Sequence, residues 1–499
     1  MIINWQYWTA FLLATICCFF LHELSQTRRR KGLPPGPRGL PILGNLHELG
    51  KNPHQDLCKL AQKHGPIMHM RFGNVPTIVV SSAEAAEKFL KTYDHVFAGR
   101  PYHEGSWYIS YEGRSLVFSP YGPYWRKMRQ LCNLHLLTRN RISSFEPMRR
   151  KEVGLFIESL KRAASDGVDV DLTTAMWSLG ANMSCLMIFG KKYLDKDFED
   201  KRFSDAVREA LHLSAQPNIG DYFPLLRSLD LQGFTRRFKR IAKIYDDLLE
   251  KIIDDHLKSP GREEANDFVD ILMDLMESGK FEFEFDRRHV KALLLEMLIT
   301  SMDSTMATID WAITELLRHP DIMKKLQREI EGKVGMGRIV EESDLEGLMY
   351  LDMVVKESMR LHPVGTLGLP HESIEDCTVD GFHIQKNTRL IINIWAIGRD
   401  PSVWPDPESF IPERFVGSNV DLRGQDFQLI PFGSGRRSCP GLALALTDVR
   451  FVLAQLVHCF DWKLSDNIQH SDLDMSEAFG IVTTRAQHLR VVPIYRLQK

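Results

Sequence analysis

The chain has 499 residues, of which 44% are hydrophobic and 26% charged, and its formal net charge at pH 7 is −2. This is the composition of a globular protein, and a charge balance close to zero argues against a nucleic-acid partner. Eight scattered cysteines without paired or metal-finger spacing favour a reducing compartment over a disulfide framework.

The N-terminal segment has the character of a membrane span. Nearly every residue from Trp5 to Leu21 is apolar or aromatic, and the basic run Arg28–Lys31 follows. About 17 residues is the short limit for a spanning helix, and a positive flank after it keeps the remaining chain in the cytosol. A cleaved signal peptide is the alternative, although no small-residue cleavage site supports it. We predict a membrane anchor at 1–27, a basic and proline-rich hinge at 28–41, and one globular domain at 42–499.

The segment 121–129 is predicted to be an amphipathic helix. It places Trp125 and Arg129 on one helical face, where an indole N–H and a guanidinium could both donate to an anionic group. A helix on the protein surface explains the same pattern equally well.

A long helical pattern over Arg287–Leu317 is interrupted by the polar run Thr300–Thr305. Hydroxyls and an acid inside a buried helix are costly and can bend it. One interpretation turns this polar run to solvent. The functional interpretation is a polar notch in which Asp303 and Ser304 pass protons to bound oxygen.

Two further segments supply a carboxylate and two arginines. Glu357 and Arg360 lie on one face of a predicted helix, and Arg414 lies in the proline-bounded loop Phe410–Phe415. A solvated surface pair is the usual meaning of Glu357 and Arg360 alone. With Arg414, one carboxylate shared by two guanidiniums could instead lock the loop in place.

The motif Pro431–Gly441 is the most informative in the chain. Cys439 precedes an apolar helix expected from Pro440 to about Phe460, and a helix N-terminus stabilises a thiolate. Glycines around it leave room for a flat group, Phe432 offers a ring, and Arg437 offers a cation for acidic substituents. A buried structural cysteine is the alternative. A haem, which needs a thiolate on iron and cations on its propionates, accounts for the whole motif.

Together these segments resemble the cytochrome P450 superfamily of haem-thiolate monooxygenases, over nearly the whole chain. Details such as 396–401 and 122–126 resemble the plant endoplasmic-reticulum enzymes of specialised metabolism. The resemblance implies a mainly α fold with small β regions that holds haem b (iron protoporphyrin IX), with Cys439 as axial ligand of the iron. It implies that Glu357, Arg360 and Arg414 form a structural triad. It also assigns the haem contacts to Trp125, Arg129, His371, Phe432 and Arg437.

The long-helix motif departs from the usual pattern of relatives. Ser304 stands where threonine is usual, and Ser301 replaces a glycine that normally leaves a groove for oxygen. A serine hydroxyl is less firmly oriented than that of threonine. Hydroxylation remains the expected reaction, while the coupling efficiency and reaction subtype stay open.

By the same resemblance, the substrate pocket is expected to be apolar and without a cluster of fixed positive charge. Its predicted lining is Trp107, Ile299, Ser301, Met302, Val364, Leu367, Leu369, Phe479 and Ile481. Such a pocket suits a small apolar metabolite, first a terpenoid such as a sesquiterpene and next a phenolic such as a flavonoid or biphenyl.

The resemblance further implies O₂ as co-substrate and NADPH-derived electrons from an NADPH–cytochrome reductase. That partner would dock on a basic surface that includes Arg126, Lys127, Arg436 and Arg437. The haem domain would lie on the cytosolic side of the endoplasmic reticulum membrane. Alternatives are a haem-thiolate isomerase or dehydratase, an aldoxime- or nitrile-oxidising enzyme, and a non-enzymatic membrane-anchored haem sensor.

Overall fold

The computed structural model describes residues 32–192, 201–258, 267–279, 283–465 and 468–498. Within them the chain is mainly helical with four small sheets, so the predicted fold class is confirmed. The predicted membrane anchor and the start of the hinge lie outside the described residues. The rest of the hinge is neither helix nor regular strand. It lies beside β1 (Ile67–Phe72), where the Pro35 carbonyl accepts the N–H of His69 at 2.9 Å.

The longer helices are α2 (Pro53–His64), α5 (Pro123–Leu131), α7 (Glu146–Asp166), α8 (Leu172–Phe189), α9 (Lys201–Ala215), α11 (Phe234–Lys258), α12 (Phe268–Glu277), α13 (Arg287–Arg318), α14 (Pro320–Val334), α15 (Met349–Leu361) and α17 (Leu442–Cys459). Short helices are α3 (Ala83–Glu87), α4 (Glu104–Ile109), α6 (Arg139–Ser144), α10 (Ile219–Tyr222) and α16 (Ile394–Ile397). Single turns of 3₁₀ or π type are η1 (Leu46–Glu48), η2 (Lys88–Thr92), η3 (Cys132–Leu136), η4 (Pro224–Leu229), η5 (Glu342–Leu345), η6 (Pro412–Phe415), η7 (Gly435–Arg437) and η9 (His470–Asp472).

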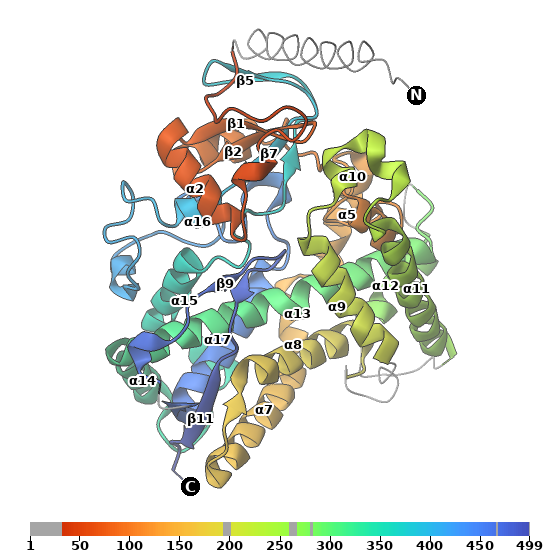
Figure 1. Cartoon of the computed structure of the whole chain (residues 1–499). Helices are drawn as coiled ribbons and strands as arrows, with labels where there is room; N and C mark the ends of the chain where they lie inside the picture. The colour runs from red at the N-terminus through yellow and green to blue at the C-terminus, as the bar shows by residue number, and fades with distance from the viewer. Residues whose placement is uncertain (1–31, 193–200, 259–266, 280–282, 466–467, 499) are drawn as a thin grey trace, which may run out of the picture.

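Helix α13 crosses the middle of the body (Figure 1). A capping box between Asp286 and His289 starts it, and it ends at Arg318 because Pro320 disfavours helical conformation at the residue before it. The predicted helix 287–317 therefore ends one residue earlier than the helix in the structure. Its first half packs into one hydrophobic core cluster, with α11 and α12, and its second half into another, with α15 and α17. The polar run 300–305 lies where the helix passes from one cluster to the other.

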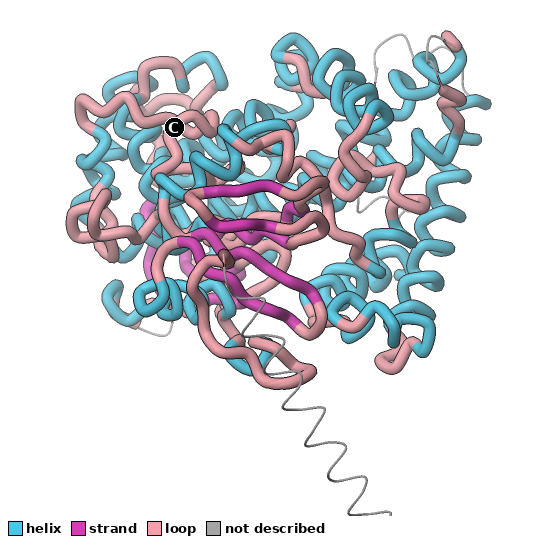
Figure 2. Tube along the Cα trace, turned by 90° about the horizontal axis from the view of Figure 1, so that it is seen from above, coloured by secondary structure: helices cyan, strands magenta, loops and turns pink. Residues whose placement is uncertain are grey.

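The strands form small sheets that lie among the helices (Figure 2). Their bounds are β1 (Ile67–Phe72), β2 (Val75–Val80), β3 (Val170–Asp171), β4 (His371–Glu372), β5 (Cys377–Val379), β6 (Phe382–Ile384), β7 (Arg389–Ile392), β8 (Phe460–Leu464), β9 (Glu477–Ala478), β10 (Thr484–Arg485) and β11 (Arg490–Tyr495). In Figure 1, β1, β2 and β7 lie at the top of the body and β11 lies near its bottom. The largest sheet has the order β1-β2-β7-β4, and β2 pairs with β7 in parallel. A parallel pair needs a crossover connection, and here nearly all helices lie between the two strands. This pairing brings residues 77–80 beside residues 389–392.

Candidate active site

The Cys439 loop lies directly before α17. The helix begins at Leu442 with Gly441 as N-cap. The sequence predicts Pro440 as its first residue, whereas in the structure Pro440 precedes the helix. The N–H of Cys439 donates to the Phe432 carbonyl at 2.9 Å and closes the loop. The Cys439 side chain is exposed to open space, yet enough protein surrounds it that burial raises the pKa of its thiol, while the Gly441 N–H lowers it. A thiol that binds a metal is deprotonated outright, so the Cys439 sulfur can serve as a thiolate ligand of iron despite its raised pKa.

Gly435 is required by the packing of the loop. Its φ is +69°, and a Cβ there would lie 2.4 Å from the Leu90 carbonyl oxygen of η2. The sequence pattern predicts that this glycine leaves room for a flat group. The structure gives a different reason, because η7 must approach the backbone of η2 closely.

Four basic side chains gather beside this loop, namely Arg100, Arg129, His371 and Arg437. Burial lowers the pKa of Arg100 to about 10, and burial together with the neighbouring arginines lowers the pKa of Arg437 to about 9. Burial, together with the charges of Arg100 and Arg437, lowers the pKa of His371 to about 3. The carboxyl of Glu296 faces Arg437, but burial raises the pKa of Glu296 to about 7. The cluster therefore has excess positive charge.

Arg437 points into the body. Its guanidinium donates to three backbone carbonyls at 2.7–3.3 Å and lies 4.4 Å from the centre of the Trp125 ring. The Trp125 indole N–H donates to the Leu116 carbonyl at 2.8 Å. Arg437 is therefore not available to the docking surface on which the sequence analysis placed it, whereas Arg436 is exposed.

These groups fit a haem. Buried cations are costly unless a counter-charge meets them, and two propionates would supply that charge to the cluster. Arg129, His371 and Arg437 would hold the propionates, and Cys439 would bind the iron. Trp125, the fourth predicted contact, donates its only N–H to the Leu116 carbonyl and packs against Arg437. Phe432 packs against the core at the start of the loop, on the same side as α17. When bound through a thiolate, haem supplies the chemistry of oxygen activation.

Asp303 and Ser304 lie on adjacent faces of α13. The Asp303 carboxylate accepts the indole N–H of Trp177 on α8, and burial raises its pKa while this hydrogen bond lowers it. The Ser304 hydroxyl donates to the Thr300 carbonyl at 3.0 Å, and Thr300 is exposed and lines the cavity described below. A hydroxyl bonded to the carbonyl of the preceding turn bends a helix, so this contact lies at the notch that the sequence predicts.

Ser301 and Met302 turn away from the cavity. The Ser301 hydroxyl donates to Ser184 on α8 at 2.8 Å, and Met302 is only 2% exposed. Gly180 of α8 packs closely against the Met302 carbonyl. The structure therefore places these two residues at the α8–α13 contact, and we leave them out of the proposed substrate pocket. The rotation of the helix about its axis is decided by packing against α8.

The structure brings Glu357, Arg360 and Arg414 together. Glu357 and Arg360 are at most 1% exposed and form two hydrogen bonds at 2.7 and 2.8 Å. Arg414 Nε donates to Glu357 Oε1 at 2.8 Å, and the N–H of Ile411 donates to the same oxygen. The remaining guanidinium N–H groups donate to backbone carbonyls of residues 398–409. One carboxylate thus fixes α15 to the loop around η6.

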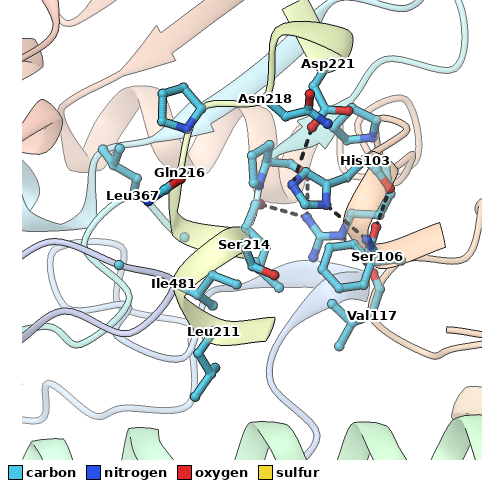
Figure 3. A pocket seen from close by; sticks show the side chains of 18 of the residues that line it. His103, Ser106, Val117, Leu211, Ser214, Gln216, Asn218, Asp221, Leu367 and Ile481 are labelled. Atoms are coloured by element: carbon cyan, nitrogen blue, oxygen red, sulfur yellow. Dashed lines mark hydrogen bonds and ion pairs between the residues drawn. The ribbon is translucent and has the colours of Figure 1, made fainter. Parts of the chain in front are cut away.

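A cavity of about 810 Å³ is bordered by Ile299 and Thr300 of α13 and by Arg100 of the basic cluster, and Figure 3 shows part of its lining. Five predicted residues line it: Ile299, Leu367, Leu369, Phe479 and Ile481. Trp107 and Val364 are not among the lining residues. Trp107 is 38% exposed and packs against Tyr102 in a tilted arrangement, with the ring centres 5.6 Å apart.

Charged residues that the sequence did not predict also line the cavity, among them Arg100, Glu296 and Arg389. The lining therefore contains positive charge at Arg100 and Arg389, although the sequence predicts no cluster of fixed positive charge there. Glu296 accepts the N–H groups of Leu116 and Val117 at 2.6 and 2.5 Å. A sequence signal existed for Glu296, since it is an acid inside the apolar run 293–298, whereas the two arginines carry no local signal.

Comparison with known proteins gives consistent matches over nearly the full chain. The sequence model described as Cytochrome P450 matches residues 34–490. Cytochrome P450 CYP736A12 of Panax ginseng is 47% identical over 97% of this chain and 98% of its own length. The 4-hydroxyphenylacetaldehyde oxime monooxygenase of Sorghum bicolor is 41% identical over 98% of this chain and 95% of its length. The flavonoid 3'-monooxygenase CYP75B137 of Crocosmia x crocosmiiflora is 39% identical over 98% of both.

Proposed function

The chain belongs to the cytochrome P450 family, as a monooxygenase of the plant type, and we propose that it hydroxylates a small, largely apolar metabolite with O₂ and electrons from NADPH. The observation that carries this proposal is the arrangement around α13. Glu296 of α13 faces Arg437 in the basic cluster beside the Cys439 loop, and Glu296 and Arg100 also line a cavity whose other walls are mostly apolar. Thr300, beside the Ser304 hydroxyl, borders that cavity.

Asp303 and Ser304 are proposed to deliver protons during the reaction. A buried carboxyl with a raised pKa holds a proton more readily than one in water, and Trp177 keeps it in a fixed position. The Ser304 hydroxyl, one residue further, can pass a proton toward the cavity side of the helix.

The substrate class is proposed from the size and lining of the cavity. A volume of about 810 Å³ accommodates a molecule of the size of a sesquiterpene, a flavonoid or a biphenyl. The electron donor is proposed to be an NADPH–cytochrome reductase, and the location the endoplasmic reticulum membrane. The exposed Arg126 and Arg436 support a basic docking surface for such a partner.

A second candidate function is oxidation of an aldoxime. Two relatives are named as oxime monooxygenases, 4-hydroxyphenylacetaldehyde oxime monooxygenase and phenylacetaldehyde oxime monooxygenase CYP71AN24 of Prunus mume, at 41% and 39% identity.

The deciding experiment measures product mass. Microsomes that contain the protein and a plant reductase are supplied with NADPH and, separately, with sesquiterpenes, phenolics and aromatic aldoximes. A gain of one oxygen that depends on NADPH and is lost in Cys439→Ala supports the proposal. Conversion of an aldoxime without hydroxylation of the other compounds supports the second candidate. Turnover that does not require NADPH contradicts both and points to an isomerase or dehydratase.

A further inference from the structure

Arg389, the first residue of β7, is a buried cation in the wall of the cavity. It is 9% exposed, and its Nε has no hydrogen-bond partner among the residues that the structure describes. Its guanidinium lies 5.6 Å from the centre of the Tyr222 ring. A buried guanidinium without a full set of acceptors is costly, so the site favours a ligand that supplies an acceptor atom.

The groups around Arg389 decide what kind of acceptor fits. Glu372 lies directly opposite Arg389 in the β4–β7 pair, and the Asp221 carboxylate lies 3.5 Å from the His103 ring. Burial and Arg389 lower the pKa of His103, while Asp221 opposes this effect. The Asp221 carboxylate and the Arg389 guanidinium line this end of the cavity, and Glu372 lies beside Arg389 outside the lining. Because Asp221 and Glu372 already oppose the charge of Arg389, a neutral oxygen atom fits better than an anion.

These polar groups lie far from the helix that carries the proposed proton donors. In Figure 1 β7 and α10 lie above α13, and in Figure 3 Asp221 and His103 lie at the upper right while Leu211 and Ile481 lie below them. Ile299 and Thr300 of α13 line the same cavity. A molecule that spans the cavity would thus place a polar atom near the sheet and its apolar body against Leu211, Ile481 and α13.

We propose that Arg389 binds a neutral oxygen atom of the substrate, a hydroxyl, methoxyl or carbonyl group, so that the substrate is already oxygenated and presents its apolar end to the reaction. This inference rests on the proposed function. It favours a phenol or an oxygenated terpenoid over the unfunctionalised sesquiterpene hydrocarbon. It also implies that an oxygen-introducing reaction precedes this enzyme.

The test uses the ferric holoprotein and the spectral shift that follows substrate binding, so no reductase is needed. Two pairs of ligands are titrated, biphenyl with hydroxybiphenyl and farnesene with farnesol, and biphenyl carboxylate is added as an anion. The wild type is expected to bind at least one oxygenated member about tenfold or more tightly than its hydrocarbon partner, since hydrogen bonds to charged groups have this magnitude. Arg389→Met should remove this preference and leave hydrocarbon binding unchanged. The control Arg423→Met, at an exposed arginine, should keep the preference.

Several outcomes would overturn the inference. These are a wild type without preference in either pair, no spectral shift with either oxygenated ligand, an unchanged preference in Arg389→Met, and tighter binding of the carboxylate than of the phenol. If Arg389→Met fails to bind haem, the wild-type preferences and Arg389→Lys, which keeps the charge but lacks Nε, decide the question. Hydroxylated product of the wild type is measured separately. If Arg389→Met loses the binding preference and the wild type forms no hydroxylated product, the inference is supported and only the proposed function is contradicted.

Discussion

At the scale of single residues, α13 carries several enclosed acids, and two of them, Asp303 and Asp310, differ in what they face. Asp303 bonds to Trp177, whereas Asp310 accepts a hydrogen bond from Thr173, and burial raises the pKa of Asp310 to about 6. Asp303→Asn keeps an acceptor for Trp177 but removes the proton donor. We expect product formation to fall about 100-fold or more, while NADPH oxidation continues. Asp310→Asn is the matched control and should keep the ratio of product to NADPH. Equal ratios in both variants would contradict the proton-delivery role of Asp303.

Glu296 offers a prediction about pH. Burial raises the pKa of Glu296 from 4.5 to about 7, against the opposing effect of the N–H groups of Leu116 and Val117. Between these two values the folded state binds more protons than the unfolded state, so its contribution to stability falls as the pH rises from about 4.5 to 7. Glu296→Gln removes this dependence. The melting temperature of the wild type minus that of the variant should decrease between pH 5 and 8, by the equivalent of about 3 kcal/mol at most. A constant difference across this range would show that Glu296 titrates normally.

At the scale of elements, the Glu357 carboxylate joins α15 to the loop around η6 and leaves two buried guanidiniums dependent on it. Glu357→Gln should lower the free energy of unfolding by about 3–5 kcal/mol, because removing one partner leaves buried charge uncompensated. Glu413, in η6 itself, makes a half-exposed pair with Lys325 at 2.7 Å, so Glu413→Gln should cost about 1 kcal/mol or less. Urea unfolding and haem content check both variants. Similar losses in the two would indicate that the shared carboxylate has no special role.

The same elements show how far sequence patterns reach. The bounds of α13 and the pair Glu357–Arg360 are local properties, because helical period and spacing lie within one element. The pairing of Arg414 with Glu357 could also be predicted from the sequence, because the proline-bounded loop that carries Arg414 is distinctive. The orientation of Ser301 and Met302 was not, because the rotation of α13 depends on Gly180 and Ser184 of α8, more than a hundred residues earlier.

At the scale of the whole molecule, the residues that sequence reasoning missed are those whose partners are distant. Arg100 donates to the carbonyls of Leu369 and Pro370, and Arg389 enters the cavity only because β7 pairs with β2 across nearly the whole chain. A single arginine in an ordinary loop or strand carries no periodic signal. The Cys439 motif could be interpreted early because the iron ligand, its loop and the following helix are adjacent in sequence.

Membrane attachment also belongs to this scale. Three described helices, α8, α13 and α17, are long and apolar enough to cross a membrane, but 56–72% of each candidate window is buried inside the body. They are explained as core helices. The span expected at residues 5–21 lies outside the described residues. On the described surface, η4 and the turn after it expose Leu225 by 88%, Leu229 by 61% and Leu231 by 62%.

We expect two separable contributions to membrane binding. A chain shortened to residues 32–499 keeps every described element, so it should retain a thiolate-type carbon monoxide spectrum. It should still sediment partly with phospholipid vesicles, because burying each exposed leucine contributes about 1.5–3 kcal/mol. Adding Leu225→Glu and Leu229→Glu to the shortened chain should release it, while the same changes in the full chain should not. Extraction of the full chain from microsomes by alkaline wash would contradict a spanning segment. Complete solubility of the shortened chain before the leucines are changed would show that they do not contact lipid.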